Sequence, residues 1–190
     1  TADLTWTSIE GSSDDERDGS GGVDDYSDSD DDDFTSDGTD ISKALVSTSA
    51  DHTSGNDVAI GEIVTYTIDV NLPEATIPSL IITDNLPVGL AFITGTVVLD
   101  DAGFGGTLPS FTIDSNEGNG DDIVITFGSF TNTGDNNTSN DEFSITFQAL
   151  VLNTAANNGY SGNTTMDNTA TIQIGTLPPE TTPPVQITVV

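Results

Sequence analysis

The stretch that decides the fold is Glu62-Ile63-Val64-Thr65-Tyr66-Thr67-Ile68-Asp69-Val70, in which polar and apolar residues alternate. Side chains of a β-strand point alternately to the two faces of its sheet, so a period of two residues predicts a strand with one buried face. The inward set is Val64, Tyr66, Ile68 and Val70, and Asp69 faces solvent.

The same pattern continues from Ile41 to the end of the chain, and no segment has a convincing helical period. Clusters of Gly, Asn and Asp separate the runs and predict turns. The expected strands are 41–48, 62–71, 79–84, 90–99, 122–130, 142–152, 167–174 and 184–190, with a weak one near 110–113. Short strands with threonine-rich outward faces are typical of a sandwich, so we expect an all-β, immunoglobulin-like antiparallel β-sandwich.

Residues 10–40 have a different composition, dominated by Asp, Ser and Gly with few apolar side chains. Such a segment cannot bury enough surface to fold alone. Residues 1–5 resemble 169–173 in spacing and alternation. We therefore interpret 1–40 as an acidic tail or hairpin, either the closing hairpin of a preceding repeat or a strand-donating extension, and 41–190 as one sandwich domain.

The charge of the chain limits its partners. It has 32 acidic residues against two basic ones, for a formal net charge of −30. Such a chain repels nucleic acid and anionic membranes, attracts cations, and suits an extracellular setting. It contains no cysteine and no run of 18 apolar residues, so we expect neither disulfides nor membrane insertion by this segment.

Lys43 is the only lysine, and strand alternation places it on the apolar face of Ile41 and Leu45. One interpretation is a lysine that extends its amine past a strand end to water. The other is a buried amine with covalent chemistry. The same parity places Asn168 with Ala170 and Ile172, and a third polar residue, Asp84, with Leu80 and Ile82. Three inward polar residues suggest a site.

Several segments in this order resemble the isopeptide-forming fimbrial and adhesin domains, relatives of collagen-adhesin and pilin-backbone sandwiches and of bacterial surface-protein repeats. These segments are Lys43, Ile60 to Ile68, Leu72-Pro73, Ile82 to Leu90 and Asn168 to Ile172, and Asp84 to Leu90 follow the repeat signature Asp-x-Leu-Pro-x-Gly-Leu. The resemblance covers about 41–190. It implies an extracellular module, stacked in tandem in a surface protein or filament.

The resemblance also implies roles for the three inward polar residues. In members that cross-link, a first-strand lysine joins a late-strand asparagine beside a catalytic acid, which assigns these roles to Lys43, Asn168 and Asp84. Glu62 is the reserve candidate for the acid. Burial keeps an amine neutral and nucleophilic, and a carboxylic acid held in an apolar site can polarise the amide and carry protons. Because the reaction happens once, we expect no turnover enzyme.

The acidic segment is a second candidate site. Asp24, Asp25, Asp28, Asp30 and Asp32 could supply oxygen ligands to calcium where repeats join, because hard oxygen donors without His or Cys favour that ion. The alternative is a solvated acidic tail. The smaller acidic pairs at 100–101, 121–122 and 141–142 lie at strand ends and could bind calcium in the same way, but plain surface charge is the preferred interpretation.

Two classes of function remain. The first is a structural repeat or subunit of a surface adhesin or fimbrial filament, assembled with neighbouring copies in tandem or by strand addition. The second is a calcium-dependent binding module whose loops 100–109 or 132–141 hold glycans or another surface.

Overall fold

The computed structural model describes residues 2–4, 28–30, 38–155, 157 and 164–190. The chain divides into two units, Thr1–Ser36 and Asp37–Val190. In the first unit, β1 (Ala2–Leu4) pairs antiparallel with β2 (Asp28–Asp30). The proposed roles of residues 1–40, as a closing hairpin or a strand-donating extension, stay predictions.

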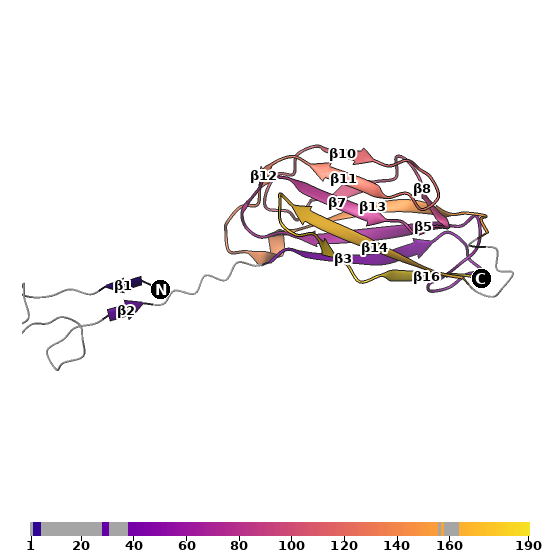
Figure 1. Ribbon diagram of the computed structural model, residues 1–190, viewed down its shortest axis with the longest axis horizontal. Helices are drawn as coiled ribbons and strands as arrows, with labels where there is room; N and C mark the ends of the chain where they lie inside the picture. Colours follow the sequence, from indigo (N-terminus) through magenta and orange to yellow (C-terminus); the bar gives the residue numbers. More distant parts are fainter. Residues whose placement is uncertain (1, 5–27, 31–37, 156, 158–163) are drawn as a thin grey trace, which may run out of the picture. The chain divides into compact units, whose positions relative to one another are not determined.

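The second unit is an all-β sandwich, as the sequence predicts, and Figure 1 shows its two layers. The larger sheet has seven strands, and all its pairs are antiparallel except the parallel pair β16–β4. In spatial order they are β10 (Phe111–Asp114), β11 (Ile123–Phe127), β7 (Leu80–Asn85), β14 (Thr164–Ile174), β16 (Val185–Val189) and β4 (Asp57–Val58), with β15 (Glu180–Thr181) paired to β14.

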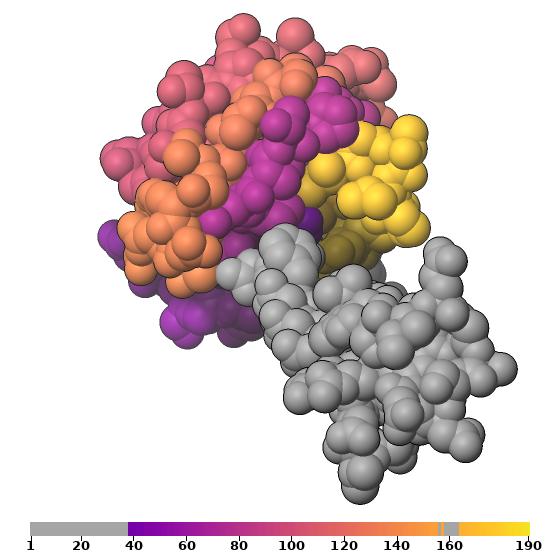
Figure 2. Space-filling view, turned by 90° about the vertical axis from the view of Figure 1, so that its left-hand side faces the viewer, coloured from indigo at the N-terminus to yellow at the C-terminus, as the bar shows by residue number. Residues whose placement is uncertain are grey.

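The second sheet has five strands. They are β3 (Asp40–Thr48), β5 (Ile63–Asn71), β13 (Glu142–Val151) and β8 (Leu90–Phe92) in spatial order, with β9 (Val98–Asp100) also paired to β13. A separate ribbon joins β6 (Thr76–Ile77) to β12 (Phe130–Thr131), and Figure 2 looks at the end of the sandwich where this ribbon lies.

The predicted alternation of β5 is confirmed. Val64, Tyr66 and Ile68 are each 0% exposed. Asp69, which lies between the buried Ile68 and Val70, is exposed. Phe147 of β13 lies opposite Tyr66 in the ladder, and their ring centroids are 5.7 Å apart. A core of aliphatic and aromatic side chains from both sheets therefore fills the space between the layers.

The expected strand 90–99 is wrong as a single element, because the structure divides it into β8 and β9, which pair with different parts of β13. Gly95 between them has φ of +76°, a left-handed conformation outside the β region. The hydroxyl of Thr96 donates a hydrogen bond to the carbonyl of Ile93 and closes the turn. The weak strand near 110–113 is confirmed as β10.

Helical structure is slight in the described residues. One 3-10 turn, η1 (Thr138–Asn140), is capped by the side chain of Asn137, which accepts a hydrogen bond from the backbone of Ser139. Within the same residues, no helix is long and apolar enough to cross a membrane.

Candidate functional site

Lys43 lies inside the sandwich. It sits on β3 opposite Ile68 of β5, and its side chain is 0% exposed. Its Nζ lies 4.8 Å from the ring centroid of Tyr66 and 5.1 Å from that of Phe147. Burial lowers the pKa of Lys43 from 10.5 to about 6, because the charged form loses its hydration. With a pKa of about 6, the amine is mainly neutral at pH 7. The interpretation of a lysine that extends its amine past the strand end to water does not fit a side chain that is 0% exposed.

Asp84 meets the lysine from the other sheet. It lies near the end of β7, its side chain is 1% exposed, and its Oδ2 pairs with Nζ of Lys43. Its other oxygen, Oδ1, has no hydrogen-bond partner among the described residues. One carboxylate oxygen is thus engaged with the amine, and the second is available to another group.

Asn168 is the third inward polar residue. It lies on β14, two positions from Ala170, which is directly opposite Asp84 in the β14–β7 ladder. Residues in this diagonal relation have Cα atoms about 7–8 Å apart, within reach of their side chains. Asn168 is 0% exposed, and neither Oδ1 nor Nδ2 has a hydrogen-bond partner in the described part of the chain. An amide in this state is available for reaction.

The structure therefore brings the predicted residues Lys43, Asp84 and Asn168 to one interior region from three strands. β3 lies against β14 as well as pairing with β5, which places the lysine strand beside the asparagine strand. The gold β14 passes in front of the purple β3 and β5 in Figure 1. The group comprises a largely neutral amine, a carboxyl group and an unpartnered amide, the set that amide-bond formation requires.

Two aromatic residues complete this region, and no functional role was predicted for them. Tyr66 and Phe147 form the apolar wall over the lysine amine. The sequence did place Tyr66 on the inward face. A phenol among aliphatic inward residues was the available signal, because a buried hydroxyl needs a partner.

Glu62, the reserve acid, has a different environment. Its carboxylate accepts hydrogen bonds from the backbone of Ala50 and Ala59 and from the hydroxyl of Thr53, at 2.7–3.0 Å. Burial raises the pKa of Glu62, but these hydrogen bonds together bring it below its ordinary value. Glu62 precedes β5, about 20 Å along the strand from Ile68, the partner of Lys43. Glu62 stabilises the loop of Ala50, Thr53 and Ala59, and it is too far from Lys43 to act as the acid of the cross-linking reaction.

Asp141 corrects the interpretation of the acidic pair at 141–142. It is 2% exposed, and its Oδ1 accepts a hydrogen bond of 2.8 Å from Nδ2 of Asn132. The same Nδ2 also donates to the carbonyl of Leu72 at 3.1 Å. Asp141 therefore joins the end of β5 to the loop after β12, while the neighbouring Glu142 is the exposed member.

The predicted calcium ligands are largely outside the described residues. Asp24, Asp25 and Asp32 lie outside them, and Asp28 and Asp30 are described only as backbone positions of β2. Among the residues whose side chains are described, no group of three or more His, Asp or Glu is arranged to hold a metal ion. The calcium site stays a prediction.

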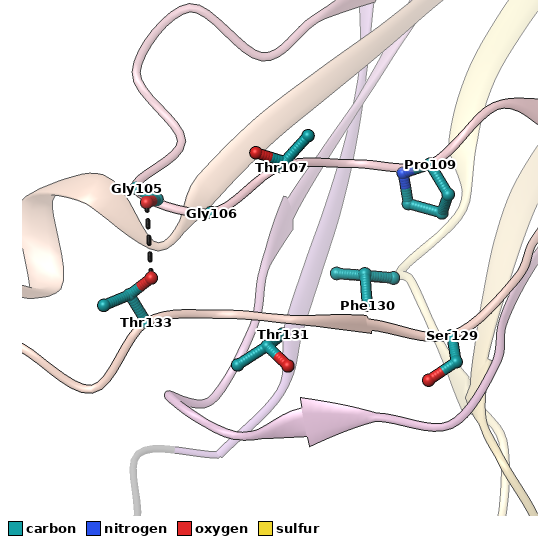
Figure 3. Close-up of a pocket in the computed structure, with 8 residues that line it drawn as sticks. All are labelled: Gly105, Gly106, Thr107, Pro109, Ser129, Phe130, Thr131 and Thr133. Carbon is teal, nitrogen blue, oxygen red and sulfur yellow. Dashed lines mark hydrogen bonds between the residues drawn. The ribbon is translucent and has the colours of Figure 1, made fainter.

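An open pocket of about 490 Å³ lies near the β6–β12 ribbon (Figure 3). One wall is the loop from Gly105 to Pro109, and the other is the segment from Ser129 to Thr133. The hydroxyl of Thr133 donates to the carbonyl of Gly105 across one end, at 3.4 Å. No carboxylate lines this pocket.

Comparisons with known proteins show what this sandwich is similar to. No family model matches the chain, and no curated protein is significantly similar to it in sequence. Among solved structures, BcpA, the major pilin subunit of Bacillus cereus, superimposes with a TM-score of 0.51 and 13% identity, over 82% of this chain and 41% of that one. The chain has the fold of pilin and adhesin domains.

Two adhesin-type structures agree. The N-terminal domain of the Streptococcus gordonii adhesin Sgo0707 matches with a TM-score of 0.50 and 16% identity, over 80% of this chain and 32% of that one. The C-terminal domain of the Streptococcus agalactiae polypeptide BspA matches with a TM-score of 0.50 and 13% identity, over 79% and 49%. The chain spans less than half the length of each of these three proteins. The resemblance indicated by the sequence is thus confirmed for the fold.

Proposed function

We propose that the chain is a structural module of a cell-surface filament or adhesin, and that it forms an internal isopeptide bond between Lys43 and Asn168 with Asp84 as the catalytic acid. The observation that carries this proposal is the buried group itself. A lysine amine whose pKa is about 6 pairs with Asp84, close to a buried Asn168 amide that has no hydrogen-bond partner among the described residues.

The proposed reaction balances without a co-reactant. Nζ of Lys43 attacks Cγ of Asn168, a bond forms between these atoms, and the bond from Cγ to Nδ2 breaks. Asp84 takes a proton from the attacking amine and delivers one to the departing nitrogen, which leaves as ammonia. The unpartnered Oδ1 of Asp84 is available for the second transfer. Since the product is the module itself, this is a single event and not turnover.

The bond would tie the two sheets together, because Lys43 belongs to the five-stranded sheet and Asn168 to the seven-stranded one. It would not join the first strand of the sandwich to the last, as a cross-link at the chain ends would, since β15 and β16 follow Asn168. It would enclose a loop of about 125 residues. By analogy with a disulfide across so long a loop, it would contribute roughly 5 kcal/mol to stability.

A surface location fits the charge and the fold. The net charge of −30 keeps modules apart in an extracellular medium, and the sandwiches that this chain resembles come from pilins and adhesins. The partners we propose are neighbouring copies, in tandem or through strand addition by residues 1–40.

Pulling on the full chain tests the mechanical part of this function. A force applied between Thr1 and Val190 would extend a chain without a cross-link by about 3.3–3.6 Å per residue over its whole length. With the bond, the loop from Lys43 to Asn168 cannot extend, and we expect about a third of that length. Full-length extension of the wild-type chain would contradict the proposal.

The alternative of a calcium-dependent ligand-binding module has weaker support. The pocket in Figure 3 involves both loops expected to hold a ligand, 100–109 and, through Thr133, 132–141, but its lining residues carry no carboxylate that could place a calcium ion there. A glycan array probed with and without calcium would favour this function only if binding depended on the ion.

A further inference from the structure

Tyr66 lines the proposed cross-linking site beside the amine of Lys43. It lies on β5 between Leu45 of β3 and Phe147 of β13, and it is 0% exposed. Its ring lies against the amine of Lys43, with 4.8 Å between Nζ and the ring centroid. The residue therefore shapes the surroundings of the nucleophile, whatever its hydroxyl does.

The hydroxyl of Tyr66 lies near the electrophile. Burial raises the pKa of Tyr66, and the nearby amide of Asn168 opposes that rise, which is the effect of an N–H donor on a phenol. The hydroxyl makes no hydrogen bond among the described residues, and turning the amide over presents Oδ1 to it in place of Nδ2. A phenol with a raised pKa keeps its proton at neutral pH, so it is available as a donor.

The energetic cost of the hydroxyl points to a role. A buried hydroxyl without a hydrogen bond costs about 1–3 kcal/mol, whereas a phenylalanine ring would incur no such cost. Phe147 packs beside Tyr66 in the same layer, which shows that this region accommodates a plain aromatic ring. Asn168 carries a similar energetic cost, because both polar atoms of its buried amide lack hydrogen-bond partners among the described residues.

We propose that Tyr66 is a further functional residue of this site, whose hydroxyl donates a hydrogen bond to Oδ1 of Asn168 during formation of the cross-link. The donor withdraws electron density from Cγ and stabilises the negative charge that develops on Oδ1 as Nζ of Lys43 attacks. It also holds the amide in the orientation that presents Oδ1 to Tyr66, so that Nδ2, the leaving nitrogen, is free to accept a proton from Asp84. This role rests on the proposed isopeptide bond.

The test follows the reaction in time in the full 190-residue chain. Wild type and Tyr66→Phe are made by cell-free synthesis, quenched in acid at intervals, and weighed intact to give the fraction that has lost one ammonia. Removing one donor to a developing oxyanion slows reactions by about 10²–10³-fold, so we expect Tyr66→Phe to lose ammonia at least tenfold more slowly. The factor should be the same at pH 7 and pH 8, because the phenol acts without ionising.

A structural effect is separated in a background that cannot react. Lys43→Met/Tyr66→Phe is compared in melting temperature with Lys43→Met, and Lys43→Met/Phe147→Leu serves as the packing control. We expect the first pair to differ by little and the packing control to melt lower, since it loses part of a buried ring.

Each outcome decides a question. An unchanged rate in Tyr66→Phe would overturn the role of Tyr66 and leave the cross-link standing. A slower rate accompanied by a loss of stability as large as that of the Phe147→Leu control would assign the effect to packing and also overturn it. A wild-type chain that never loses ammonia would overturn the cross-link itself, and the role of Tyr66 with it.

Discussion

Lys43 of β3 and Asp84 of β7 belong to different sheets, and their side chains meet in the interior of the sandwich. A lysine amine in this position loses its hydration, which is the cause of its low pKa. Retaining the only lysine of a very acidic chain in such a place is costly unless the amine is used. A covalent bond to Asn168 would remove the cost of the unreacted amine and would stabilise the fold by closing a loop.

Removing the electrophile should weaken the fold. We expect Asn168→Ala to unfold with a free energy roughly 5 kcal/mol smaller than wild type, because the unfolded chain is no longer constrained by a closed loop. Chemical denaturation measures this difference. The control is Asn85→Ala, which removes an amide on the same pair of strands that bonds to Thr169 and Thr171, and which should cost about 1 kcal/mol. Equal effects of the two substitutions would contradict the prediction.

The unreacted lysine should leave a mark on the pH dependence of stability. In Asn168→Ala, Lys43 has a folded pKa of about 6 against 10.5 when unfolded, so between these values the folded state binds fewer protons. Stability should therefore rise with pH across that window, by up to about 1.4 kcal/mol per pH unit. The measurement is denaturation of Asn168→Ala at pH 7 and pH 9.

Its control is Asn168→Ala/Lys43→Met, which shares every other titrating group. We expect this double variant to lack the rise. Parallel curves for the two proteins would show that Lys43 titrates normally and is not buried as a neutral amine.

Gly89, the glycine of the Asp84–Leu90 signature, should not tolerate a side chain. Gly89 has φ of +111°, and a Cβ there would lie 2.5 Å from Oδ1 of Asn157 and 2.6 Å from Sδ of Met166. Asn157 is buried and donates to the carbonyls of Gly89 and Leu152, so it cannot move freely. We expect Gly89→Ala to cost about 2 kcal/mol or more in the free energy of unfolding.

Gly128→Ala is the matched control, because a Cβ at Gly128 would meet nothing within 4 Å. It should change the free energy of unfolding by less than about 0.5 kcal/mol. A cost at Gly128 equal to that at Gly89 would mean that the close approach of Asn157 is not the cause.

Calcium should stabilise the chain beyond the effect of ionic strength. Carboxylates are concentrated in residues 10–40, and a bound divalent cation would offset their repulsion. We expect the melting temperature to rise in millimolar calcium more than in sodium at matched ionic strength. The rise should be lost when four of the predicted ligands are changed to Asn, namely Asp24, Asp28, Asp30 and Asp32.

The control removes four exposed carboxylates elsewhere, namely Asp51, Asp57, Asp101 and Asp122. This variant should keep the response to calcium. If sodium raises the melting temperature of the wild type as much as calcium does, the effect is charge screening alone and residues 10–40 hold no calcium site.

Strand parity in the sequence predicted much of the candidate site. Because the side-chain period of a strand is two, the neighbours of Lys43, Asp84 and Asn168 were enough to place each of them inward. The order of the strands in space was not available from that pattern. Parity cannot show which inward residues face each other, so it did not reveal that the ring of Tyr66 lies against the amine of Lys43.

Two other features depended on contacts distant in sequence. From the sequence, Asp141 was interpreted as a surface charge beside Glu142. Its burial is favourable because it accepts a hydrogen bond from the amide of Asn132, which lies in the loop after β12. The division of 90–99 into β8 and β9 depends on a left-handed turn at Gly95 inside an apolar run, where hydrophobic periodicity carries little information.

The intact mass of the denatured wild-type chain decides whether the isopeptide bond forms. We expect a mass lower by one ammonia than that calculated from the sequence, and the full mass in each of three variants, Lys43→Ala, Asn168→Ala and Asp84→Ala. If the loss persisted in Asp84→Ala, the catalytic acid would be misassigned. A wild-type chain that keeps its full mass, or that loses water through a bond between Lys43 and Asp84 instead, would show that Lys43 and Asn168 are not joined.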